Sequence, residues 1–156
     1  MAERGAGNPT QDERVMAALA HGSIFLSFWG LIAAIVIWMT QREKSRYVRF
    51  QALQATAYHF VYIALSIPLG MIVAIVMFGI FAAFPFMLGD LQALETADPF
   101  TAMGWFNLPF LGMMCIAWPL WLAYVAYGVV GAIQCLRGND FRYVLIGRWL
   151  DDHAND

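Results

Sequence analysis

Residues Phe50–Gly89 read FQALQATAYHFVYIALSIPLGMIVAIVMFGIFAAFPFMLG, a stretch without a single Asp, Glu, Lys or Arg. Two more runs of the same kind lie on either side of it in the chain, Val15–Gln41 and Pro99–Leu136. About 20 apolar residues in a helix suffice to cross the hydrocarbon core of a bilayer, and each run exceeds that length. The runs therefore predict an all-α, polytopic transmembrane protein with three long spans.

The composition supports a membrane protein and bounds its domain organisation. The chain is 61% hydrophobic and 15% aromatic, and only 13% of its residues are charged, whereas soluble domains carry about 25% charged residues. A net charge of -2 is also unlike that of a nucleic-acid-binding protein. We expect one transmembrane domain, residues 15–150, between a flexible N-terminal tail, residues 1–14, and a C-terminal tail, residues 151–156.

The basic residues are unevenly distributed among the loops and indicate the orientation. The loop between the first two runs contains Arg42, Lys44, Arg46 and Arg49. Three more arginines follow the third run, whereas residues 90–98 hold Asp and Glu but no Lys or Arg. The positive-inside rule places the basic loop and the C-terminus in the cytoplasm and the acidic loop outside. We expect the membrane to be the inner (plasma) membrane of a bacterium.

The first run admits two topologies. As one continuous span it leaves the N-terminus outside, whereas a re-entrant helix pair broken at Ser27–Gly30 places all nine basic residues on one side. Non-helical backbone at that depth has to be shielded by protein. We favour the continuous span, because a run of this length fits a tilted helix and glycine is tolerated in membrane helices. The other runs are longer than one crossing requires, so we expect kinks or short interfacial helices within 79–89 and 99–111. Dividing the second run would give four crossings, which is the minority topology.

Small residues at helical spacing are the expected packing surfaces, because lipid is as apolar as leucine and helices in a bilayer associate through close approach. The predicted packing positions are Ser23, Ser27, Gly30, Ser66, Gly70 and Gly128. We expect these residues to pack the chain's own helices together. A second interpretation is that one stripe binds another membrane protein subunit or a second copy of the chain.

Two histidines, His21 and His59, are the ionisable groups inside the runs, and such groups are functional candidates by default. A neutral imidazole is a common axial ligand of haem and related pigments, so each is a candidate cofactor-binding residue. In the continuous-helix topology they lie at different depths, which argues against one iron bound by both. A structural role, with the ring hydrogen-bonded to a carbonyl or a nearby Ser, is the favoured interpretation. Together with Gln51 and Gln54 the histidines could also line a polar vestibule.

No carboxylate lies within the three runs, and the sequence contains neither a phosphate-binding glycine loop nor a Ser/His/Asp order. We therefore predict no enzymatic activity, no metal site and no required cofactor. The minimal loops and the small-residue stripes favour an accessory or scaffold subunit that packs against a larger membrane complex. The alternatives are a translocation or channel component and, more weakly, a pigment or haem bound by a single histidine.

Three segments of the chain resemble a known family. They are Asp12–His21, the segment Ile37–Ser45 with its continuation Phe50–Ala55, and the aromatic and basic segment Arg137–Tyr143. Together they resemble the bacterial Tic-twenty-like membrane proteins, which are grouped with a chloroplast inner-envelope import component and are largely a domain of unknown function. The resemblance implies a membrane-embedded helical fold over most of the chain and a role in protein import or membrane insertion.

Overall fold

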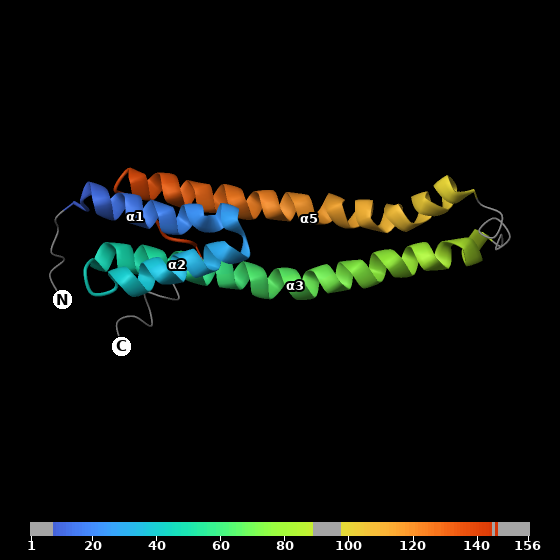
Figure 1. The fold of residues 1–156 in the computed structure, drawn as a ribbon, viewed down its shortest axis with the longest axis horizontal. Coiled ribbons are helices and arrows are strands. Elements are labelled where there is room, and N and C mark those ends of the chain that lie inside the picture. The colour runs from blue at the N-terminus through green and yellow to red at the C-terminus, as the bar shows by residue number, and fades with distance from the viewer. Residues whose placement is uncertain (1–7, 89–97, 145, 147–156) are drawn as a thin grey trace. The chain divides into compact units, whose positions relative to one another are not determined.

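The computed structural model of the protein describes residues 8–88, 98–144 and 146. Its elements are α1 (Gln11–Gly22), the 3₁₀ helix η1 (Ser23–Leu26), α2 (Phe28–Gln41), α3 (Arg46–Leu88) and α5 (Pro99–Leu136). These described segments are helical and contain no strand (Figure 1). The all-α prediction is therefore confirmed for this part of the chain.

The chain forms two compact units, which are described separately. The hairpin unit comprises residues 1–63 and 124–156, and the two-helix unit comprises residues 64–123. Two helices are long and apolar enough to cross a membrane, over Arg46–Ala83 in α3 and Asn107–Leu136 in α5. The most apolar stretch of α3 is not buried inside the protein, which is the behaviour of a helix that faces lipid.

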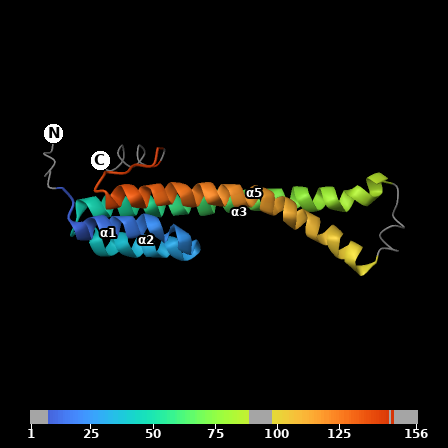
Figure 2. The same ribbon diagram turned by 90° about the horizontal axis from the view of Figure 1, so that it is seen from above.

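The first apolar run is not one helix, so the prediction of a continuous first span is wrong. Helix α1 ends at Gly22, η1 follows, and Ser27 adopts a φ of 50° before α2 begins at Phe28. The chain reverses there, and α1 and α2 lie side by side as a helical hairpin (Figures 1 and 2). The break falls within Ser27–Gly30, the position that the re-entrant alternative required.

The hairpin turn is held by its own backbone and by one serine. The Ser23 hydroxyl donates to the carbonyl oxygens of Ala20, at 2.8 Å, and of Gly30, at 3.0 Å. A Cβ at Gly30 would overlap the carbonyl oxygen of Ser23 and lie 3.0 Å from Nε2 of His59. Glycine is therefore required at this position for α2 to return so close to η1. The side chains of Phe25, Phe28 and Trp29 at the turn are exposed, so this close backbone approach is made by η1 and α2 alone.

The second and third runs each form one helix. Helix α3 continues through Gly79, so its division into two crossings is not found, and Gly89 lies outside the described residues. Helix α5 begins at Pro99 and contains Pro109 and Pro119 in its interior. The short interfacial helix predicted within 99–111 is therefore absent from the structure. Proline is tolerated inside membrane helices because neighbouring groups satisfy the freed backbone carbonyls.

The start of α1 is fixed by a capping box. Oγ1 of Thr10 accepts a hydrogen bond from the backbone N–H of Glu13, and Oε2 of Glu13 accepts one from the N–H of Thr10 at 2.7 Å. Oε1 of Glu13 accepts a further bond from the Ser45 hydroxyl, just before α3. The first turn of α1 thus lies beside the start of α3, although residues up to 14 were assigned to the N-terminal tail; residues 1–7 are outside the described part.

Small side chains form the core of the hairpin unit. One buried cluster consists of Ala20, Ala34, Ala52 and Ala55, and a second consists of Ala17, Ala18 and Cys135. These clusters bring α1, α2, the first turns of α3 and the last turns of α5 into contact. Such small residues let helix backbones approach closely where lipid offers no hydrophobic driving force between helices.

Candidate functional site

His21 is the centre of a buried polar cluster in the hairpin unit. Its side chain is fully buried, with Nδ1 3.0 Å from the Tyr143 hydroxyl and Nε2 3.1 Å from Oε1 of Gln51. Because a carbonyl oxygen only accepts, Nε2 of a neutral His21 carries the proton and Nδ1 accepts from Tyr143. Both ring nitrogens are therefore in use within the protein.

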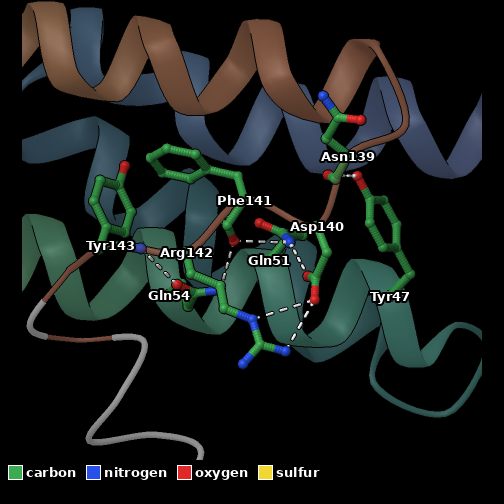
Figure 3. Close-up of polar contacts among 8 residues, drawn as sticks. All are labelled: Tyr47, Gln51, Gln54, Asn139, Asp140, Phe141, Arg142 and Tyr143. Carbon is green, nitrogen blue, oxygen red and sulfur yellow. Dashed lines mark hydrogen bonds and ion pairs between the residues drawn. The ribbon is translucent and has the colours of Figure 1, made fainter.

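Two glutamines on α3 bind the segment Asn139–Tyr143, which we name the return segment. Nε2 of Gln51 donates to Oδ1 of Asp140 at 2.9 Å and to the carbonyl oxygen of Phe141 at 3.1 Å. Gln54 donates to the same carbonyl at 3.1 Å and accepts from the backbone N–H of Tyr143 at 3.1 Å (Figure 3). The glutamine amides thus satisfy backbone groups of a segment that has no helix of its own.

The sequence brings this segment to α3 by two local devices. Gly138 has a φ of 79°, a left-handed conformation that suits glycine and ends α5, so the chain turns back. On α3, Tyr47, Gln51, Gln54 and Tyr58 recur at helical spacing and share one face. The ring of Tyr58 stacks on that of Tyr143 with centroids 4.2 Å apart. The Tyr47 hydroxyl donates to the carbonyl oxygen of Asn139 at 3.1 Å.

The exposed side of the polar cluster carries charged side chains, whereas its buried side does not. Asp140 forms an ion pair with Arg142 at 3.0 Å, and both side chains are about half exposed. The guanidinium of Arg142 also lies 5.5 Å from the ring centroid of Phe50. Inside, burial raises the pKa of the Tyr143 phenol far above its ordinary value, with neighbouring tyrosines adding to the effect. Tyr143 consequently keeps its proton and remains a hydrogen-bond donor to His21.

His59 lies in the same unit but makes different contacts. Its Nδ1 is 2.7 Å from the carbonyl oxygen of Ala55, one turn earlier in α3. Its Nε2 is buried without a hydrogen-bond partner and faces the backbone of Gly30. Within the described ranges no group of three or more His, Cys, Asp or Glu side chains could hold a metal ion. Cofactor binding by either histidine stays a prediction.

The predicted packing residues lie in different surroundings. Ser23 and Gly30 are in the hairpin turn, Ser27 is exposed at its tip, and a Cβ at Gly128 would overlap Ile24. In the two-helix unit, Gly70 has open space around it. The basic-loop residues Arg42, Lys44, Arg46 and Arg49 are all exposed. Within this cluster, His21, Gln51 and Gln54 were predicted from the sequence as polar residues of one vestibule. Tyr143 was not predicted as a site residue, because it lies far from them in the sequence and no local pattern marks it.

The fold and site define a small helical membrane protein in which the polar cluster around His21 binds the protein's own return segment. Residues 12–150 match the family model described as the magnetosome magnetite crystal formation protein family, MamF/MmsF, and the chain belongs to this family. No curated protein and no solved structure matches the chain.

The family match corrects the resemblance drawn from the sequence. The chain is not a Tic-twenty-like protein, and the role in protein import that this resemblance implied falls with it. An Ala-His pair in the first helix and a basic loop after an apolar Trp segment were its main support. Both features suit any small membrane protein with a buried histidine and a cytoplasmic loop, so they did not discriminate between families.

Proposed function

We propose that this protein is a non-catalytic accessory subunit of the magnetosome membrane and contributes to magnetite crystal formation by packing against other membrane proteins. Membership of the magnetosome magnetite crystal formation protein family supports both the magnetosome location and the role in crystal formation. The observation that carries the accessory role is the polar cluster around His21. Its donors and acceptors are paired with the return segment and with one another, so the cluster has no group directed at a substrate.

The two-helix unit supplies the surface for such packing. Leu65, Met71 and Ile75 on α3 are largely exposed, and Met114 and Trp118 on α5 are exposed as well. In a bilayer this surface meets lipid or a partner subunit. Since helix association in lipid depends on shape rather than on hydrophobicity, a partner needs a specific set of side chains on this surface.

Two experiments test the role. Deletion of the gene in its host should give smaller or fewer magnetite crystals by electron microscopy, and the wild-type gene should restore them. Mild detergent extraction should then recover the protein together with other membrane proteins. Unchanged crystals, or a protein that is always extracted alone as a monomer, would contradict the proposal.

A matched set of three variants distinguishes packing from folding. L65A and I75A shorten exposed side chains of the two-helix unit, and V130A shortens an exposed side chain of the hairpin unit. All three should be extracted as folded protein. If the proposed surface binds a partner, only the first two should lose the co-purified proteins and fail to restore normal crystals.

The finer localisation follows from charge. In place of the bacterial inner membrane, we assign the chain to the magnetosome membrane, with the basic loop and the C-terminus on the cytoplasmic side. The acidic loop at residues 90–98, which we expect on the other side of the membrane, lies outside the described residues apart from Asp98. An impermeant thiol reagent should label a cysteine placed at Arg42 from the cytoplasmic side of intact magnetosomes.

A channel lined by the buried polar residues is the less favoured function. His21, Gln51 and Gln54 are each hydrogen-bonded within the hairpin unit, so a water path along them would require these bonds to break. Binding of a pigment or haem by His59 is a separate hypothesis. The absorption spectrum of the purified protein tests it, because a bound haem gives a Soret band.

A further inference from the structure

Between Val15 and Met39, the exposed large side chains of the α1–α2 hairpin are apolar. Its large exposed side chains are Val15, Met16, Leu19, Phe25, Leu26, Phe28, Trp29, Ile32, Val36 and Met39. The exposure is greatest at the tip, where Phe25 is 63%, Phe28 is 60% and Trp29 is 69% exposed. A protein in water would not present such a continuous apolar surface without a partner or a membrane to cover it.

Polar residues are confined to one end of this hairpin. Asp12 and Glu13 lie in the first turn of α1, and Arg42 and Lys44 directly follow α2. The hydrogen bond between Ser45 and Glu13 holds these two ends together. The charged groups therefore mark the end that stays in water, and the apolar tip is the end farthest from it.

The length of the hairpin fits one leaflet. From Val15 to Leu26 the chain rises about 20 Å, and from Phe28 to Thr40 it returns by about the same distance. The hydrocarbon core is about 30 Å thick, so each leaflet contributes about 15 Å. A tilted hairpin of this length reaches the middle of the bilayer but does not reach the opposite interface.

We infer that the α1–α2 hairpin is a re-entrant insertion into the leaflet on the basic side, with lipid acyl chains covering its outer face. Three backbone groups of the turn are paired within the protein, which favours that depth. The Ser27 N–H donates to Ile24 at 3.2 Å, the Gly30 N–H donates to Ser27 at 3.0 Å, and the Gly30 carbonyl accepts from Ser23. The segments before α1 and after α5 then lie on the same side of the membrane.

Spin labels measure this depth directly. Cys115 is exposed and is replaced by Ala, whereas the buried Cys135 is left in place. Labels are then attached singly at W29C, L19C and M39C in the full chain, reconstituted into phosphatidylcholine and phosphatidylglycerol vesicles. Oxygen concentrates in the bilayer centre and a nickel chelate in water, so the ratio of their relaxation effects reports depth. This ratio should rise from position 39 through position 19 to a maximum at position 29.

The alternatives give different readings. A label at position 29 that the nickel chelate reaches would place the hairpin outside the core or through the far interface, and would overturn the inference. Low access to both reagents, together with a broadened spin-label spectrum, would show a second copy covering the tip if mixing in unlabelled protein removes the broadening. This result would also overturn the inference. As a second readout, cysteines at Gln11 and Val144 should react with an impermeant maleimide from the same side. Circular dichroism of each variant checks the fold.

Discussion

At the scale of single residues, the hydrogen bond between Tyr143 and His21 offers a sharp test of the polar cluster. Y143F removes the hydroxyl but keeps the ring that stacks on Tyr58. Nδ1 of His21 is then buried without a donor, which should lower the free energy of unfolding by about 1–3 kcal/mol. Unfolding in mixed micelles measures the loss. The control is Y127F, whose hydroxyl accepts only an exposed bond from Val144; an equal loss in both variants would contradict the role of the cluster.

Gly30 is the residue on which the hairpin turn depends. In G30A the new Cβ meets the carbonyl oxygen of Ser23 and lies 3.0 Å from His59, so α2 must move away. We expect a loss of about 1–3 kcal/mol in the free energy of unfolding. A Cβ at Gly22, in the last turn of α1, would have no neighbour within 4 Å. G22A should therefore be neutral or slightly stabilising when unfolded in mixed micelles. A similar loss of unfolding free energy in G30A and G22A would refute the packing argument.

The limits of sequence reasoning are also visible in single residues. His21 and Tyr143 are 122 positions apart, so their contact depends on the turn at Gly138 and on the glutamines of α3. Nothing local in the sequence specifies that combination. A structural role was expected for His21 because a buried polar group needs a hydrogen-bond partner, whichever group that is. The identity of the partner could not be predicted.

At the scale of elements, uncharged length predicted the two long helices correctly but did not predict the break in the first run. Phe50–Gly89 and Pro99–Leu136 were long enough to require helices, and α3 and α5 occupy them up to the described limits. The break in the first run was weighed as an alternative, and the continuous span was favoured because a run of this length fits a tilted helix. The hydrogen bond from the Ser23 hydroxyl to the Gly30 carbonyl, which holds the turn, has no local signal in the sequence. That hydroxyl reaches Gly30 only after the chain has reversed.

The first turn of α1 makes the hairpin sensitive to acid. The hydrogen bond from Ser45, and then that from the Thr10 N–H, lower the pKa of Glu13 below its ordinary value. The folded-state pKa is thus the lower one, so its stabilisation is present above the unfolded pKa of about 4.3 and is lost as pH falls through the folded pKa. E13Q should reduce this loss of stability as the pH falls. Helix content by circular dichroism between pH 6 and pH 3, about 1.5 units on either side of that pKa, measures it.

S45A serves as the matched variant for the Glu13 prediction. It removes the largest cause of the lowered pKa but keeps the carboxylate and the capping box. The acid transition of this variant should therefore move to higher pH while remaining visible. If wild type, E13Q and S45A lose helix content at the same acidic pH, the hydrogen bond between α1 and the start of α3 contributes nothing to stability.

At the scale of the whole molecule, a hairpin that enters one leaflet has a mechanical consequence. A helix is about 10 Å across, so α1 and α2 together add on the order of 150–200 Å² to the leaflet on the basic side. The opposite leaflet receives no such area from the hairpin. A membrane that is convex on the basic side accommodates this difference with less strain, so the protein should prefer that curvature.

Membrane tubes pulled from giant vesicles test the preference. Labelled protein, oriented with its basic loop outward, should be denser on the tube than on the flat membrane, and the ratio should increase as the tube narrows. Protein oriented with the basic loop inward is the internal control, because the same hairpin then occupies the concave leaflet and should be depleted from the tube. Equal densities at every radius in both orientations would show that the hairpin gives the protein no preference for curvature. A depletion in the outward orientation would show that its insertion adds no area to the basic leaflet.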